Sequence, residues 1–144
     1  MPPPDNACDG SGRDNRAITG TNEDDTLIGT SGSNSINGLG GNDVINGCDG
    51  NDTVNGGNVD DRIAGSQGND ILHGNLGNDL VQGDSGNDLM HGDDDNEVLN
   101  GGPENDQISG GNGNDILIGG PGNDQFSCGA GTGTITDFQL GWYT

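Results

Sequence analysis

Acidic residues recur at a fixed interval of nine along most of the chain. From residue 25 onward, twelve consecutive positions of this interval hold ten aspartates, one asparagine and one glutamate. These residues are Asp25, Asn34, Asp43, Asp52, Asp61, Asp70, Asp79, Asp88, Glu97, Asp106, Asp115 and Asp124. Carboxylate oxygens suit a hard divalent cation, provided that the fold brings successive repeats next to one another.

Calcium is the cation that fits these residues best. It accepts about six to eight oxygen ligands, including backbone carbonyls, whereas Mg²⁺ needs a smaller octahedral shell and keeps its waters. Zinc prefers histidine and cysteine, and the chain has only two histidines and three cysteines. Asn34 lacks a charge and Glu97 is longer than aspartate, so we expect sites that involve either residue to be weaker.

Two further columns keep the same interval. An apolar residue follows each acidic position by two residues, from Leu27 to Phe126, and the series continues at Ile135. A glycine precedes each acidic position by five residues, from Gly20 to Gly119. Few aliphatic residues and a net charge of −21 would ordinarily indicate disorder. A disordered tract, however, has no reason to hold three columns in register.

Each repeat divides into a six-residue turn and a short strand with one inward apolar residue. Glycine serves the turn because it adopts positive φ and leaves room beside a ligand. One inward side chain in nine residues buries too little apolar surface to offset the entropy of ordering the chain. We therefore expect folding to depend on cation binding. Two repeats, at residues 56–64 and 92–100, lack glycine at their fourth position and should be weak points.

The repeat G-G-x-G-x-D-x-U-x, where U is apolar, resembles the repeats-in-toxin (RTX) calcium-binding family. GGNGNDILI at 110–118 and GGPGNDQFS at 119–127 match it in full. The resemblance implies an all-β fold, a right-handed parallel β-roll of about twelve to thirteen nonapeptides, two per coil. It also implies that Ca²⁺ lies between successive turns on each side. One side would hold Asp25, Asp43, Asp61, Asp79, Glu97 and Asp115, and the other Asn34, Asp52, Asp70, Asp88, Asp106 and Asp124. The gaps predict about ten calcium ions, whose charge nearly cancels that of the chain.

Composition excludes several other functions. The chain has no lysine and only three arginines, so it lacks the cationic face that nucleic acid requires. No apolar run is long enough to span a membrane, and the first residues do not resemble a secretory signal. The GDSG at 83–86 falls within the repeat, and no H-E-x-x-H motif is present, so we expect no enzyme.

We expect three regions: an N-terminal arm or cap at 1–19, the β-roll at 20–136, and a C-terminal cap segment at 137–144. Cys48 and Cys128 should lie about four coils apart, too far to pair within one chain. Cys8 and Cys128 lie at opposite ends, so head-to-tail stacking would allow a disulfide between neighbouring chains. The alternatives are three free thiols, or a Cys8 that caps its own chain.

Some outward positions have two interpretations. His73 and His91 are 18 residues apart and should stack on the surface, more simply as solvated side chains than as a metal or pH site. The apolar row of Leu80, Val98 and Ile116 reflects strand propensity or a lateral docking surface.

We expect a secreted or cell-surface, calcium-loaded β-roll with a structural or scaffolding role, stacking head to tail as a homo-oligomer or filament. The alternative is a C-terminal RTX module that assists export and folding of a larger toxin, adhesin or hydrolase. A third possibility is an ice-binding surface, although no threonine row is present.

Overall fold

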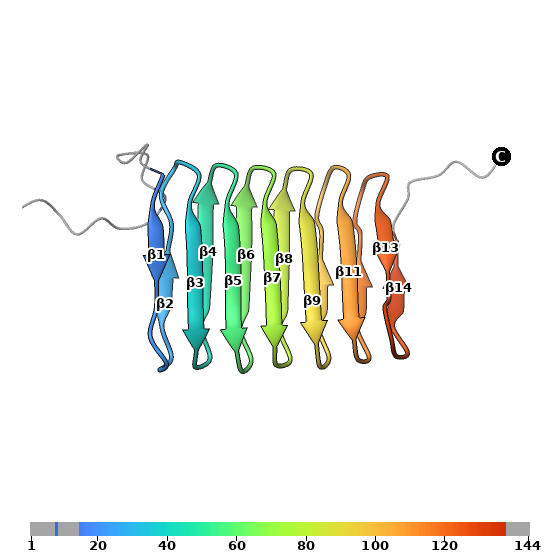
Figure 1. Ribbon diagram of the computed structural model, residues 1–144. Helices are drawn as coiled ribbons and strands as arrows, with labels where there is room; N and C mark the ends of the chain where they lie inside the picture. The colour runs from blue at the N-terminus through green and yellow to red at the C-terminus, as the bar shows by residue number, and fades with distance from the viewer. Residues whose placement is uncertain (1–7, 9–14, 138–144) are drawn as a thin grey trace, which may run out of the picture.

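Strands alone make up the regular structure of the residues that the computed structural model describes, which are residue 8 and residues 15–137. Successive strands alternate between two layers, so each turn of the chain adds one strand to each layer (Figure 1). The first layer contains β1 (Ala17–Thr19), β3 (Ser35–Gly40), β5 (Thr53–Asn58), β7 (Ile71–Leu76), β9 (Leu89–Asp94), β11 (Gln107–Asn112) and β13 (Gln125–Ser127). The second contains β2 (Thr26–Ile28), β4 (Val44–Asp49), β6 (Arg62–Gln67), β8 (Leu80–Ser85), β10 (Val98–Asn100), β12 (Ile116–Ile118) and β14 (Thr134–Thr136).

Every pair of neighbouring strands is parallel and in register with the nine-residue repeat. Ile36 pairs with Val54, and Val54 with Leu72, at steps of two repeats. The predicted all-β parallel roll with two repeats per coil is therefore confirmed. In the part of the chain that is described, no helix is long and apolar enough to cross a membrane.

The roll is slightly longer than predicted. Within the described residues it has fourteen strands, one per repeat, in two seven-stranded sheets, whereas twelve to thirteen repeats were predicted. The extra strand is β1, which begins at Ala17, within the segment expected to be an arm. Ile18 takes the inward apolar position and pairs with Ile36. The acidic column does not reach this far, because Arg16 stands at its position.

Each nine-residue repeat was expected to form a three-residue strand and a six-residue turn. The strands are longer than this, and the turns are shorter. Eight strands have six residues, because the first three residues of the glycine segment stay paired with the next coil. Leu39, for example, pairs with Gly57. Positive φ falls on the second and fourth residues of this segment, as at Leu39 (81°) and Gly41 (101°). The chain therefore changes sheets within a tight turn.

The core is a single file of apolar side chains between the two sheets. These buried residues are Leu27, Ile36, Ile45, Val54, Ile63, Leu72, Val81, Met90, Leu99, Ile108 and Leu117. Ile18 at one end and Phe126 at the other are partly buried against them. Because each strand contributes one such residue, the remaining interior is lined by glycine and by the acidic residues of the repeat.

Candidate metal centres

The two predicted columns of acidic residues lie along the two long edges of the roll. Each acidic residue directly precedes a strand, as Asp43 precedes β4 and Asp52 precedes β5. The structure therefore brings together the members of each predicted column. From Asp43 to Asp115 the aspartates, together with Asn34 and Glu97, are buried, whereas Asp25 and Asp124 at the ends are half-buried.

One oxygen of each buried aspartate is used in a ladder between coils. The backbone N–H of Asp43 donates to Oδ1 of Asp61 at 2.8 Å, and that of Asp61 donates to Asp79 at 2.7 Å. The other edge repeats the pattern, for example from Asp52 to Asp70 at 2.8 Å. Hydrogen bonds to a charged acceptor are stronger than neutral ones, so the ladder positions each carboxylate.

The second oxygen of these aspartates is buried without a hydrogen-bond partner. This holds for Oδ2 of Asp43, Asp52, Asp61, Asp70, Asp79, Asp88, Asp106, Asp115 and Asp124. Each lies beside the first glycine of its own repeat, and from Asp43 to Asp106 a glycine carbonyl of the next coil lies there too. A Cβ on Gly38 would lie 2.3 Å from Oδ2 of Asp43 and 2.2 Å from the carbonyl oxygen of Gly56. Two oxygen atoms therefore face the same space, which only glycine leaves open.

Burial raises the pKa of the central carboxyl groups of the columns, from Asp52 to Asp106. The pKa of Asp70 rises to about 7, chiefly by desolvation, and the neighbouring Asp88 and Asp52 add to the rise. Desolvation also raises the pKa of Asp79 and Asp106 to about 7. Without a cation, the deprotonated state of the columns is therefore unfavourable.

The donors that converge here are carboxylate oxygens and backbone carbonyls. Within the described residues, no three His, Cys, Asp or Glu side chains gather into a metal-binding group. Zinc, which is held by such side-chain groups, fits poorly. Calcium accepts a mixture of carboxylate and carbonyl oxygens, so the unpartnered Oδ2 atoms and the adjacent carbonyls fit it.

The columns depart from the pattern at three residues. Oδ2 of Asp25 accepts from the backbone N–H of Thr21 at 2.6 Å, and the Asn34 side chain bonds to Thr30 and Gly32. The Asp25 and Asn34 side chains therefore form hydrogen bonds within their own turns. Both carboxylate oxygens of Glu97 are buried without a partner. Burial, followed by the adjacent Asp115, raises the pKa of Glu97 to about 8.

A second ladder lies on the outside of each edge, at the residue before each aspartate. The backbone N–H of Asn69 donates to Oδ1 of Asn51 at 2.9 Å, and Asn87 donates to Asn69 at 2.8 Å. The amides come from the residue before each aspartate, and the bonds run in the opposite direction to those of the carboxylates. The recurrence of asparagine at this position was the available signal.

The expected disulfide between neighbouring chains is wrong. Cys8 is bonded to Cys48 of the same chain, with Cα atoms 5.2 Å apart, and Cys128 is free. Cys48 lies on the outside of β4, where Cys8 can reach it. Cys128 packs against the last part of the core. Its neighbour Gly133 stands where an aspartate would follow, so the larger side chain has room.

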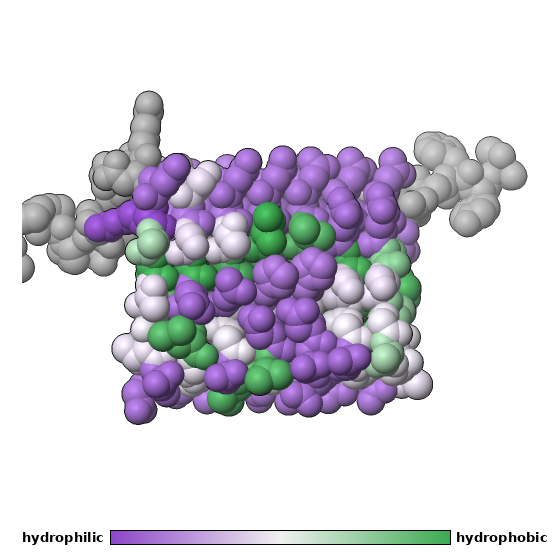
Figure 2. Space-filling view, viewed as in Figure 1, coloured by the Kyte–Doolittle hydropathy of each residue, from purple (hydrophilic) through white to green (hydrophobic). Residues whose placement is uncertain are grey.

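The outer faces carry scattered features rather than a second site. Leu39, Ile71 and Leu76 are among the exposed apolar side chains. Figure 2 shows that on one face the apolar patches are separated by polar side chains. The His73 and His91 rings stack with centroids 4.8 Å apart, as predicted, and Nδ1 of His73 lies 3.3 Å from Asp93. Leu80, Val98 and Ile116 are in register on β8, β10 and β12, and docking there remains a prediction.

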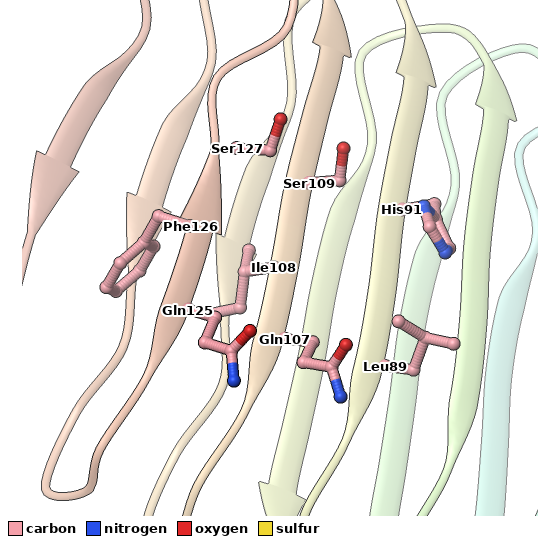
Figure 3. Close-up of a pocket in the computed structure, with 8 residues that line it drawn as sticks. All are labelled: Leu89, His91, Gln107, Ile108, Ser109, Gln125, Phe126 and Ser127. Carbon is pink, nitrogen blue, oxygen red and sulfur yellow. The ribbon is translucent and has the colours of Figure 1, made fainter.

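One shallow pocket lies on the outer face of β9, β11 and β13 (Figure 3). The amides of Gln107 and Gln125 and the hydroxyls of Ser109 and Ser127 form two short rows there. His91 is the one titratable residue of its lining. A nucleophile with a general base and an orienting group is therefore not assembled in this pocket.

Comparison with known proteins agrees with the geometry. The family model described as RTX calcium-binding nonapeptide repeat, in four copies, matches three adjoining segments, at residues 19–54, 55–90 and 91–126. No curated protein and no solved structure matched the chain. The matched segments cover most of the chain and carry both columns of acidic residues. The chain belongs to the RTX calcium-binding nonapeptide repeat family.

Proposed function

We propose that the chain is a structural protein, secreted or displayed on the cell surface, that folds when Ca²⁺ occupies the two acidic columns. The observation that carries this proposal is the series of buried carboxylate oxygens without partners. Unpaired buried charge is costly, and a cation between coils removes the cost. The ligands would be Asp25, Asp43, Asp52, Asp61, Asp70, Asp79, Asp88, Asp106, Asp115 and Asp124, with weaker sites at Asn34 and Glu97.

Metal analysis of the desalted protein tests this assignment. We expect about ten Ca²⁺ per chain, set by the gaps between successive members of each column. Retention of one or two ions would contradict it. Zinc and magnesium at equal concentration serve as controls and should not displace calcium.

The scaffolding role rests on the open ends of the roll. Among the described residues, the sheets end at β1 and β2 on one side and at β13 and β14 on the other. Since all strands are parallel, a second copy added head to tail would continue both sheets. Electron microscopy in millimolar Ca²⁺ should show fibres that disperse in chelator.

A module that assists export of a larger secreted protein is the second candidate. It is favoured by the same dependence on calcium, because such a chain stays unfolded where calcium is scarce. Monomers in millimolar Ca²⁺ at high protein concentration would exclude stacking and favour this candidate. Ice binding has less support, because the outer row of Thr53, Ile71, Leu89 and Gln107 does not repeat one residue type.

A further inference from the structure

The Cys8–Cys48 disulfide joins the N-terminal segment to the second coil of the roll. The bond spans 40 residues and encloses β1, β2, β3 and the first part of β4. Cys48 is 1% exposed, although it lies on the outer side of its strand. The closed loop therefore contains the first coil and most of the second.

Cys48 is also next to a candidate calcium site. It directly follows Gly47, whose missing Cβ would lie 2.4 Å from Oδ2 of Asp52 and 2.8 Å from the carbonyl oxygen of Gly65. The backbone of Cys48 has a φ of 80°. Its N–H donates to Oδ1 of Asn46 at 3.0 Å, and Asn46 also accepts the Ser66 hydroxyl at 2.9 Å. The disulfide thus holds the turn that leads to the Asp52 carboxylate.

We propose that this disulfide makes the N-terminal coils fold at a lower Ca²⁺ concentration than the rest of the roll, so that oxidation of the two thiols makes folding start at this end. The inference rests on the calcium-coupled folding proposed above. The chain would then respond to two conditions found together outside the cell, high calcium and an oxidising environment. Forming the bond removes two protons and two electrons from the thiols, and a small disulfide such as oxidised glutathione accepts them as it becomes two thiols.

The expected effect follows from loop closure. Closing a loop of this length in the unfolded chain shifts the folding equilibrium by roughly 10² to 10³-fold. If folding binds all of the calcium ions together, this shift lowers the Ca²⁺ concentration at the folding midpoint by roughly twofold. If only the first few ions bind as the N-terminal coils fold, the same shift lowers the midpoint by roughly fivefold. The effect should be largest in the coils that the loop encloses.

Hydrogen exchange read by mass spectrometry during a calcium titration tests the proposal. The disulfide-bonded protein is compared with protein reduced in chelator, and with the double variant Cys8→Ser/Cys48→Ser. Cys128→Ser is the matched control, since that thiol is free. In both disulfide-free forms, we expect the calcium midpoint of peptides from β1 to β4 to rise at least roughly twofold. Peptides from β9 to β12 should shift less, and Cys128→Ser should change neither group.

Equal midpoints with and without the disulfide would overturn the proposal. A uniform shift in every coil would also overturn it, because the bond would then stabilise the whole roll without favouring one end. Protection of the backbone in chelator would instead contradict the calcium-coupled folding itself. The two ideas therefore fail by different results.

Discussion

Each buried aspartate divides its two oxygens between two tasks. In Asp70, Oδ1 accepts the backbone N–H of Asp52 at 2.8 Å, whereas Oδ2 has no partner. The first contact aligns two coils, and the second oxygen is available to a cation. A single residue type thereby serves both the fold and the proposed ligand set.

Substitution of Asp70 separates these tasks. Asp70→Asn keeps an oxygen for the ladder but removes the charge, so the Ca²⁺ midpoint of folding should rise. Asp70→Ala also leaves the N–H of Asp52 unpaired, at a further cost of about 1–3 kcal/mol. Calcium titration followed by circular dichroism measures both. Glu23→Gln, at an exposed carboxylate outside the columns, is the matched control, expected within about 0.5 kcal/mol of the parent. Equal effects at the two positions would contradict the column assignment.

Val59 holds an unfavourable backbone conformation. It is a β-branched residue with a φ of 79°, at the fourth position of a repeat, where glycine is usual. Val59→Gly should therefore stabilise the calcium-bound roll by about 1 kcal/mol. The control is Val44→Gly, because Val44 is equally exposed (48% against 47%) but lies within a strand. The midpoint temperature of thermal unfolding should rise for Val59→Gly and fall for Val44→Gly. A lower midpoint temperature for both variants would refute the interpretation.

At the scale of the strand and turn, glycine has two separate uses. At the second and fourth positions it supplies positive φ. At the first position of the repeat, glycine does not have a positive φ. There a side chain would collide with the carboxylate of the same repeat. A Cβ on Gly65 would lie 2.3 Å from Oδ2 of Asp70, whereas the nearest atom to a Cβ on Gly40 is 3.6 Å away.

Two alanine substitutions test the second use. Gly65→Ala should destabilise the calcium-bound roll by about 3 kcal/mol or more, because overpacking would displace the carboxylate. Gly40→Ala, also at a buried glycine without positive φ, should cost no more than about 1 kcal/mol. Denaturant unfolding in saturating Ca²⁺ gives both values. A similar loss in the free energy of unfolding for both variants would mean that the carboxylate of Asp70 does not need the open space beside Gly65.

The repeat made much of the fold and site predictable, and the missing parts have physical reasons. Acidic and apolar columns in register predicted the two edges and the single-file core. Strand length was not predictable, since Leu39 and Cys48 adopt positive φ although neither is a residue that favours it. Strand β1, with Ile18 at its inward position, was hidden because the acidic column begins only at Asp25 and Arg16 stands one repeat before it. The Cys8–Cys48 bond depends on the path of the chain outside the repeat. Two further repeats without glycine at the fourth position were overlooked; they have Glu23 and Glu104 (φ 85°) there.

At the scale of the whole molecule, the shifted pKa values predict opposite pH dependences with and without calcium. Desolvation raises the pKa of Asp61 to about 6 and that of Asp79 to about 7, above the ordinary value of 3.8. The folded metal-free chain therefore binds more protons than the unfolded chain, so its stability should rise as the pH falls from 8 toward 4. Calcium needs the deprotonated carboxylates, so its midpoint concentration should rise over the same interval.

Circular dichroism at several pH values checks both signs. In chelator, strand signal should increase on acidification, and in limiting Ca²⁺ it should decrease. An increase at low pH under both conditions would contradict the assignment of the buried carboxylates as calcium ligands.

The dependence of folding on calcium is the central claim, and one titration tests it most directly. Far-UV circular dichroism of the metal-stripped chain at neutral pH should show an unfolded spectrum in chelator and a strand-rich spectrum in millimolar Ca²⁺. Magnesium at the same concentration should leave the chain unfolded, because its smaller shell does not suit carboxylate and carbonyl oxygens between coils. A strand-rich spectrum that persists after complete removal of calcium would contradict the account.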